Sequence, residues 1–180
     1  MKREDIKKAA MKFKSQICTT REQSERLLAL GLKPETADMV YHYTKSRVPA
    51  LEWELQTKPP TSRGKFWTPQ RIAKLAFPFH KHPDGTSMTG EEVFDKLWGK
   101  DVPAWSLSRL LELIPKCIKQ SNRPNADLKI DTDNQYWFIS YEELGYDIKH
   151  QIMNSDLFES IISMIDWLID NGHFNKDYLL

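Results

Sequence analysis

Cysteine, glycine and long apolar runs are scarce or missing in this sequence of 180 residues. The two cysteines, Cys18 and Cys117, lie far apart and form no Cys-x-x-Cys pair, which argues against a disulfide framework and a thiolate zinc site. No apolar run approaches the roughly 20 residues of a membrane-spanning helix, and the charged N-terminus lacks the apolar centre of a signal peptide. We therefore expect a cytoplasmic protein with no membrane partner.

Recognisable catalytic motifs are also missing. The chain has no Gly-x-Ser-x-Gly, Walker, Gly-x-Gly-x-x-Gly or His-Glu-x-x-His sequence, and its seven glycines leave few loops that could wrap a phosphate. The adjacent pairs Glu91-Glu92 and Glu142-Glu143 fit helix capping or solvation better than acid and base catalysis. We expect no catalytic residue and no cofactor.

Apolar and aromatic residues are plentiful, and charge is unevenly divided. Hydrophobic residues make up 40% of the chain and aromatic residues 11%, which is enough for a folded core and too much for a disordered chain. Residues 1–100 hold 19 Lys and Arg against 12 Asp and Glu, whereas residues 101–180 hold 7 against 13. This pattern fits a basic half that binds a partner, or two halves that attract one another, and we favour the second reading.

We expect a single compact domain over residues 1–180. The loop-like sequence KDVPAW offers an alternative division into a helical region, residues 1–99, and an α+β region, residues 104–180. The overall expectation is an α+β protein that is mostly helical, with its helices packed on a small antiparallel β-hairpin or sheet.

Capping signals predict helices in the first half of the chain. An amphipathic pattern covers the first 17 residues, and Thr19-Thr20 with Glu22 and Gln23 predict a capped helix that stops at Gly31. A restart at Pro34 makes residues 20–46 a helical hairpin. This hairpin resembles a helix-turn-helix motif, although Leu27 replaces a small residue and its second helix would present acidic groups to DNA. We favour a structural hairpin.

Further helices are predicted by the same signals. A short helix is expected over residues 68–76, and a second capping box, Thr89 with Glu92, follows the Pro83-Asp84-Gly85 turn and predicts a helix ending at Gly99. The sequence SLSRLLELIP reads as another helix, closed by its proline.

The second half also contains the one predicted sheet. LKI and QYWFISY flank the polar turn DTDN and predict a β-hairpin. SDLFESIISMIDWLIDNG predicts an amphipathic helix across this hairpin, ending at Gly172. Trp167 falls on the flank of that helix. We expect it to be mostly but not wholly buried, against Tyr136 or Phe138.

A basic segment between residues 55 and 83 is the strongest candidate for a nucleic-acid surface. It holds six basic residues and no acidic one, interleaved with aromatic residues, as phosphate tracking and base stacking require. The alternative is that the aromatic residues enter the core while the cations stay in water. The candidate contacts are Lys58, Arg63, Lys65, Arg71, Lys74 and Lys81.

His80 and His82 are the candidate metal ligands. With Asp84 they would supply three groups, but zinc sites require three or four well-placed ligands and the other histidines have no matching spacing. We expect no metal site, and interpret the pair as part of a solvated loop.

Three segments, PAWSLSRLLELIP, YWFISYEE and LFESIISMIDWLIDNGHFNKDYL, resemble in this order a group of uncharacterised small proteins encoded by prophages and mobile elements of anaerobic gut bacteria. The resemblance covers mainly residues 103–180 and, more loosely, residues 20–46. It rests on Trp105-Ser106, Ser140-Tyr141-Glu142 and Trp167-Leu168. It implies a mobile-element accessory protein, and it brings no activity, cofactor or catalytic residue.

Well-capped helices without a catalytic constellation favour a non-enzymatic accessory or interaction protein, with another protein as its unknown partner. The alternative is a nucleic-acid-binding protein that uses the basic segment 58–82 and the helical hairpin 20–46.

Overall fold

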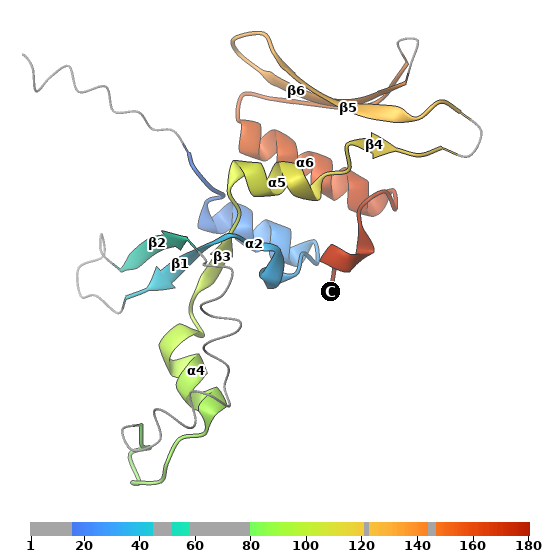
Figure 1. Ribbon diagram of the computed structural model, residues 1–180. Helices are drawn as coiled ribbons and strands as arrows, with labels where there is room; N and C mark the ends of the chain where they lie inside the picture. The colour runs from blue at the N-terminus through green and yellow to red at the C-terminus, as the bar shows by residue number, and fades with distance from the viewer. Residues whose placement is uncertain (1–15, 45–51, 58–79, 121–122, 144–146) are drawn as a thin grey trace, which may run out of the picture.

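The computed structural model describes residues 16–44, 52–57, 80–120, 123–143 and 147–180 (Figure 1). The helices are α2 Arg21–Ala29, α4 Gly90–Trp98, α5 Leu107–Leu113 and α6 Leu157–Asp170, with 3-10 turns η1 Pro34–Thr36 and η4 Lys176–Tyr178. The strands are β1 Met39–Tyr43, β2 Trp53–Thr57, β3 Val102–Ala104, β4 Cys117–Ile118, β5 Ala126–Thr132, β6 Trp137–Glu143 and β7 Ile148–Asn154.

The protein is an α+β protein, but the prediction that it is mostly helical is wrong. Within the described residues, helices and strands are of similar extent, and seven strands form two antiparallel sheets. One sheet has the strand order β2-β1-β3 and the other β4-β5-β6-β7. The expected hairpin is therefore only the centre of a larger sheet, and a second sheet lies elsewhere in the molecule.

The elements form successive layers (Figure 1). The four-stranded sheet lies at one end, α5 and α6 cover one of its faces, α2 lies beyond them, and the three-stranded sheet follows. Helix α4 extends away from these layers. The largest fully buried side chains lie in the middle layers or face them from the four-stranded sheet, and include Trp105, Tyr141, Leu27, Leu110 and Ile161.

The two helices predicted from capping boxes are confirmed. Thr20 and Gln23 form the capping box of α2, and Thr89 and Glu92 that of α4. Helix α5 begins after Ser106 as predicted. Helix α6 packs mainly on β6 and β7, rather than across the β5–β6 hairpin as expected, and Gly172 follows its end at a φ of +68°. At that φ a residue without Cβ is favoured, which explains the glycine stop.

The predicted helical hairpin over residues 20–46 is wrong, and with it the resemblance to a helix-turn-helix motif. After Gly31 the chain forms the single turn η1 and then strand β1, which pairs with both β2 and β3. The sequence of β1, MVYHY, is rich in β-branched and aromatic residues, and its non-local pairing outweighs the capping signal at Pro34. The prediction that KDVPAW is a loop is also wrong, because the centre of this segment forms strand β3. The predicted helix at 68–76, and most of that over residues 1–17, lie outside the described residues.

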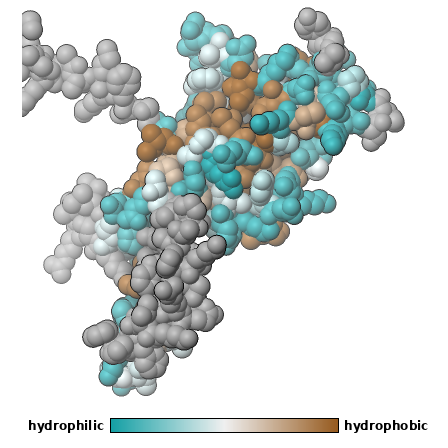
Figure 2. Space-filling model, viewed as in Figure 1, coloured by the Kyte–Doolittle hydropathy of each residue, from teal (hydrophilic) through white to brown (hydrophobic). Residues whose placement is uncertain are grey.

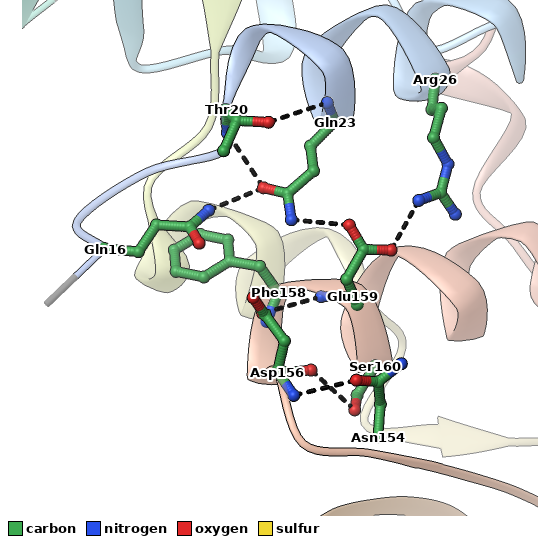
Figure 3. A network of polar contacts seen from close by, with 9 residues as sticks. All are labelled: Gln16, Thr20, Gln23, Arg26, Asn154, Asp156, Phe158, Glu159 and Ser160. Atoms are coloured by element: carbon green, nitrogen blue, oxygen red, sulfur yellow. Dashed lines mark hydrogen bonds and ion pairs between the residues drawn. The ribbon is translucent and has the colours of Figure 1, made fainter. Parts of the chain in front are cut away.

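A polar network joins the starts of α2 and α6 (Figure 3). The Gln23 side chain, 6% exposed, donates to Glu159 Oε1 at 2.7 Å and accepts from the Thr20 main chain at 2.9 Å. Arg26 Nη1 lies 2.5 Å from Glu159 Oε2. Burial opposes ionisation of Glu159, but the hydrogen bonds from Gln23 and Arg26 and the arginine charge outweigh it, so its pKa is lowered.

Candidate functional site

The basic residues proposed for nucleic-acid binding fall mostly outside the described residues. Lys58, Arg63, Lys65, Arg71 and Lys74 belong to the undescribed range, so their arrangement stays a prediction. Lys81 is described, and it is exposed in a bridge with Ser87. Of the six candidate residues, the structure therefore describes Lys81 alone.

In the loop that contains His80 and His82, the acidic residue Asp84 has a structural role. Asp84 accepts hydrogen bonds from the main chain and hydroxyl of Thr86, at 2.9 and 2.7 Å, and these bonds lower the pKa of its carboxyl group. His82 Nε2 lies 3.4 Å from the α4 residue Glu92. Within the described ranges no three histidine, cysteine or carboxylate side chains cluster as a metal site.

An aromatic and cationic cluster lies on the three-stranded sheet. Tyr43 and Trp53 meet edge to face at 5.1 Å, Arg21 lies 4.5 Å above the Trp53 ring, and Lys100 lies 4.4 Å above the Tyr43 ring. Each cation covers an aromatic face that a nucleic-acid base would otherwise use for stacking. The cluster therefore stabilises this part of the sheet, and one face of each ring is occupied by a cation.

A cleft of about 510 Å³ lies between η1 and the start of α5. Asp38 accepts from the main chain of Ser106 at 2.8 Å and from its hydroxyl at 2.5 Å. Arg109 Nε donates to the Thr36 carbonyl at 2.7 Å, and Arg109 Nη1 lies 2.9 Å from Glu112. These polar groups hold η1 against α5 by hydrogen bonds, so we interpret the cleft as a structural junction between the two elements.

The four-stranded sheet has two unequal edges. At one edge β4 is only two residues long, so most of β5 extends past it, and this part of β5 carries the charged residues Lys129 and Asp131. At the other edge β7 is seven residues long and Lys149 is its only lysine, arginine or carboxylate. Within the described residues no backbone hydrogen bond reaches the outward side of β7. Charged side chains protect sheet edges from strand addition, so β7 is the more accessible edge.

The face of this sheet turned away from α6, here called the outer face, exposes apolar side chains along β7. Ile139 and Tyr141 belong to the buried core, so the alternation of β6 places Phe138 on the outer face, and its partner in β7 is Met153. Met153 is 58% exposed and Ile148 is 53% exposed. The β7 edge and these two side chains are the candidate docking site.

Figure 2 shows a further gathering of apolar residues over the region of the four-stranded sheet and its helices. Ile130 of β5 is exposed, and its pairing with buried Ile139 places it on the helix-facing side of the sheet. We use Ile130 below as the comparison for Met153, because both are exposed apolar residues of one sheet.

Trp167 is mostly but not wholly buried, as predicted, but its neighbours differ from those expected. Its ring stacks on His150 of β7, with 4.3 Å between centroids and 3° between planes, and lies 6.2 Å from Tyr141. Phe138 points to the outer face and Tyr136 precedes β6, so neither is the packing partner of Trp167 that was expected. Burial lowers the pKa of His150 and, together with the charge of Lys149, that of His173.

Sequence reasoning missed β7 altogether, and with it Met153, Ile148 and His150. A signal was present, because Gly145 separates two runs of strand-forming residues in WFISYEELGYDIKHQIMN, as in a hairpin. The bulge opposite Tyr141 and Glu142 disturbs the alternation of β7, which explains why the pattern was weak.

Comparison with known proteins adds no relationship: no family model, curated protein or solved structure matches the chain. In the part of the chain that the structure describes, no helix combines the length and apolarity needed to cross a membrane.

Proposed function

We propose that this chain is a cytoplasmic, non-enzymatic interaction protein, an accessory of a mobile element, that binds a partner protein by adding a strand of the partner to β7. The observation that carries the proposal is the seven-residue edge strand, with exposed Met153 and Ile148 on the outer face. An extended segment of a partner with apolar side chains on one face suits this edge.

Strand addition at β7 has a clear energetic basis. Each backbone hydrogen bond of the new ladder contributes about 0.5–1.5 kcal/mol, and burial of the exposed Met153 and Ile148 side chains adds hydrophobic stabilisation. Backbone bonds would supply affinity, while the alternation of apolar and polar positions along β7 would supply specificity. Gln151, on the outer face between the two, offers an amide for a polar residue of the partner.

The test compares two substitutions in one sheet. Tagged protein is used to isolate partners from the host cell, each retained protein is identified, and its affinity is then measured with purified components. Met153→Asp places a charge on the docking edge, whereas Ile130→Asp places the same charge at an exposed residue of β5. We expect Met153→Asp to weaken binding about tenfold or more and Ile130→Asp to leave it unchanged. Equal binding by both variants would contradict the proposal.

Nucleic-acid binding is the second candidate function, and one observation favours it. The described residues hold 13 Lys and Arg against 23 Asp and Glu, so the rest of the chain holds 13 against only 2. Segments with that imbalance attract a polyanion. The helical hairpin no longer contributes to this candidate, because residues 34–43 form a turn and a strand.

A further inference from the structure

We propose that the docking edge is acid-sensitive: protonation of His150 releases β7 from α6 and weakens the binding of a partner strand. The effect on binding rests on the proposed function. The release of β7 is a property of the chain itself and can be measured without any partner.

The inference starts from the packing of Trp167 between two histidines. The His150 and Trp167 rings are almost parallel, and the His173 ring lies 5.6 Å from Trp167. On the next strand, Tyr141 is the direct partner of His150 and also stacks on Trp167. The His150 ring therefore forms the contact of β7 with Trp167 in the C-terminal half of α6.

Protonation would place a hydrogen-bond donor where no acceptor exists. His150 Nε2 is buried and has no hydrogen-bond partner among the described residues. A neutral imidazole can keep its proton on the other ring nitrogen, whereas an imidazolium carries N–H groups on both. The charged ring would then have a buried donor without an acceptor, which favours its movement into water.

The charged and titratable groups around the stack do not offset this cost. Tyr141 of β6 is a phenol whose pKa is raised by burial, so it stays neutral, and Lys149 of β7 is a cation. On α6, Asp166 and Asp170 lie in the turns around Trp167, yet burial alone accounts for the lowered pKa of His150. Burial desolvates an imidazolium and so opposes its attraction to the indole face.

The sign of the pH dependence follows from these directions. Because the pKa of His150 is lower when β7 is docked, the docked state is fully stable above the ordinary histidine pKa of about 6.5. As pH falls below that value, the open state takes up the proton first, and docking is lost progressively. His173 contributes in the same direction, because its pKa is also lowered.

Strand β7 is the element that can move. Among the described strands it pairs with β6 alone, and a register shift lies between Tyr141 and Glu142, beside the His150 pairing. Helix α6 is anchored by Ile161, Ile165 and Leu168, which are completely buried. Opening therefore costs least at the edge strand, and it removes the backbone to which a partner strand would bind.

The test measures amide exchange of β7 relative to β6 by NMR, between about pH 7.5 and about pH 5.5, either side of the histidine pKa. The ratio of the two rates cancels the pH dependence of the chemical exchange step. We expect the ratio in the wild type to rise about twofold or more at the lower pH, and in His150→Phe to rise much less, by the contribution of His173 alone. His82→Gln is the matched control, because it removes a histidine next to α4 and should retain the rise.

Direct titration of His150 in the wild type keeps the test decisive if His150→Phe does not fold. We expect its imidazole signals to titrate below about pH 6.5. A pKa at or above that value, or a constant exchange ratio in the wild type, overturns the proposal. Neither measurement involves a partner, so strand addition at β7 can fail while acid sensitivity holds, and the reverse.

Discussion

At the scale of single residues, Trp105 shows how one buried side chain joins three parts of the chain. Its indole N–H donates to Thr36 Oγ1 at 2.9 Å, and its main-chain N–H donates to Thr19 Oγ1 at 3.0 Å. Its carbonyl accepts from the Thr19 main chain at 2.9 Å. Trp105 and Thr19 are completely buried, so each polar group that folding removes from water finds a partner here. The largest buried ring therefore adds apolar contact without an unsatisfied donor.

Trp167 differs from Trp105, because it covers the edge of the core and is mostly but not wholly buried. Trp167→Ala removes the stacking partner of His150 and uncovers Tyr141, so we expect a loss of about 3 kcal/mol in the free energy of unfolding, measured by urea denaturation. The control Asp170→Ala, an exposed residue of the same helix, should change it by less than about 0.5 kcal/mol. An unchanged unfolding curve for Trp167→Ala would instead make this residue an anchor for a partner.

At the scale of elements, the junction of α2 and α6 combines a helix cap with a charge pair. Gln23 completes the capping box of α2 and also holds Glu159 in the first turn of α6. Asp156 caps α6 by accepting from the main chain of Phe158 at 2.7 Å. A carboxylate in the first turn also interacts favourably with the helix dipole. The two helices thus start side by side, and their relative position depends on a few polar contacts.

Glu159→Gln tests this junction. The substitution keeps the shape of the side chain but removes the charge that Arg26 and Gln23 stabilise, so we expect a loss of about 1 kcal/mol at neutral pH. Because the pKa of Glu159 is lowered in the folded state, its contribution is present above the unfolded value of about 4.3 and is lost as pH falls through the folded pKa. Thermal denaturation from neutral to acidic pH should therefore bring wild type and variant together. A constant gap at all pH values would contradict this account.

The same elements show what sequence alone could and could not predict. Helices α2 and α4 were found because their capping boxes lie within a few residues of each other in sequence. Strand β1 was missed because it is the central strand of its sheet, and one of its two partners, β3, comes from a distant segment of the chain, so pairing decides the conformation. For the candidate site the composition of β7 was visible, but its position at an edge depends on strand order, which no local pattern encodes.

At the scale of the whole molecule, the distribution of charge over the fold does not follow the division of the sequence into a basic and an acidic half. The described layers hold an excess of acidic residues, although the first hundred residues as a whole are basic. The positive charge of that half therefore belongs to residues outside the described ranges, including the 58–79 segment with its five basic residues and no acidic one. These cations can be attracted to either of two acidic partners: the acidic layers of the same molecule, or an external polyanion.

A measurement of nucleic-acid binding distinguishes between these two partners. Fluorescence anisotropy with single- and double-stranded DNA and RNA at low salt should show binding that weakens steeply as salt rises, because each neutralised phosphate releases counterions. A variant that replaces five basic residues with glutamine should bind more weakly and with a smaller salt slope. Its substitutions are at Lys58, Arg63, Lys65, Arg71 and Lys74.

The matched control replaces an equal charge in the N-terminal segment, and it should keep most of the salt slope if residues 58–79 form the binding segment. Its substitutions are at Lys2, Arg3, Lys7, Lys8 and Lys12. Equal losses in both variants would mean that the basic segments act only through total charge. A flat titration for the wild type would assign the cations to the acidic layers of the protein itself, and would leave the β7 edge as the site through which this molecule acts.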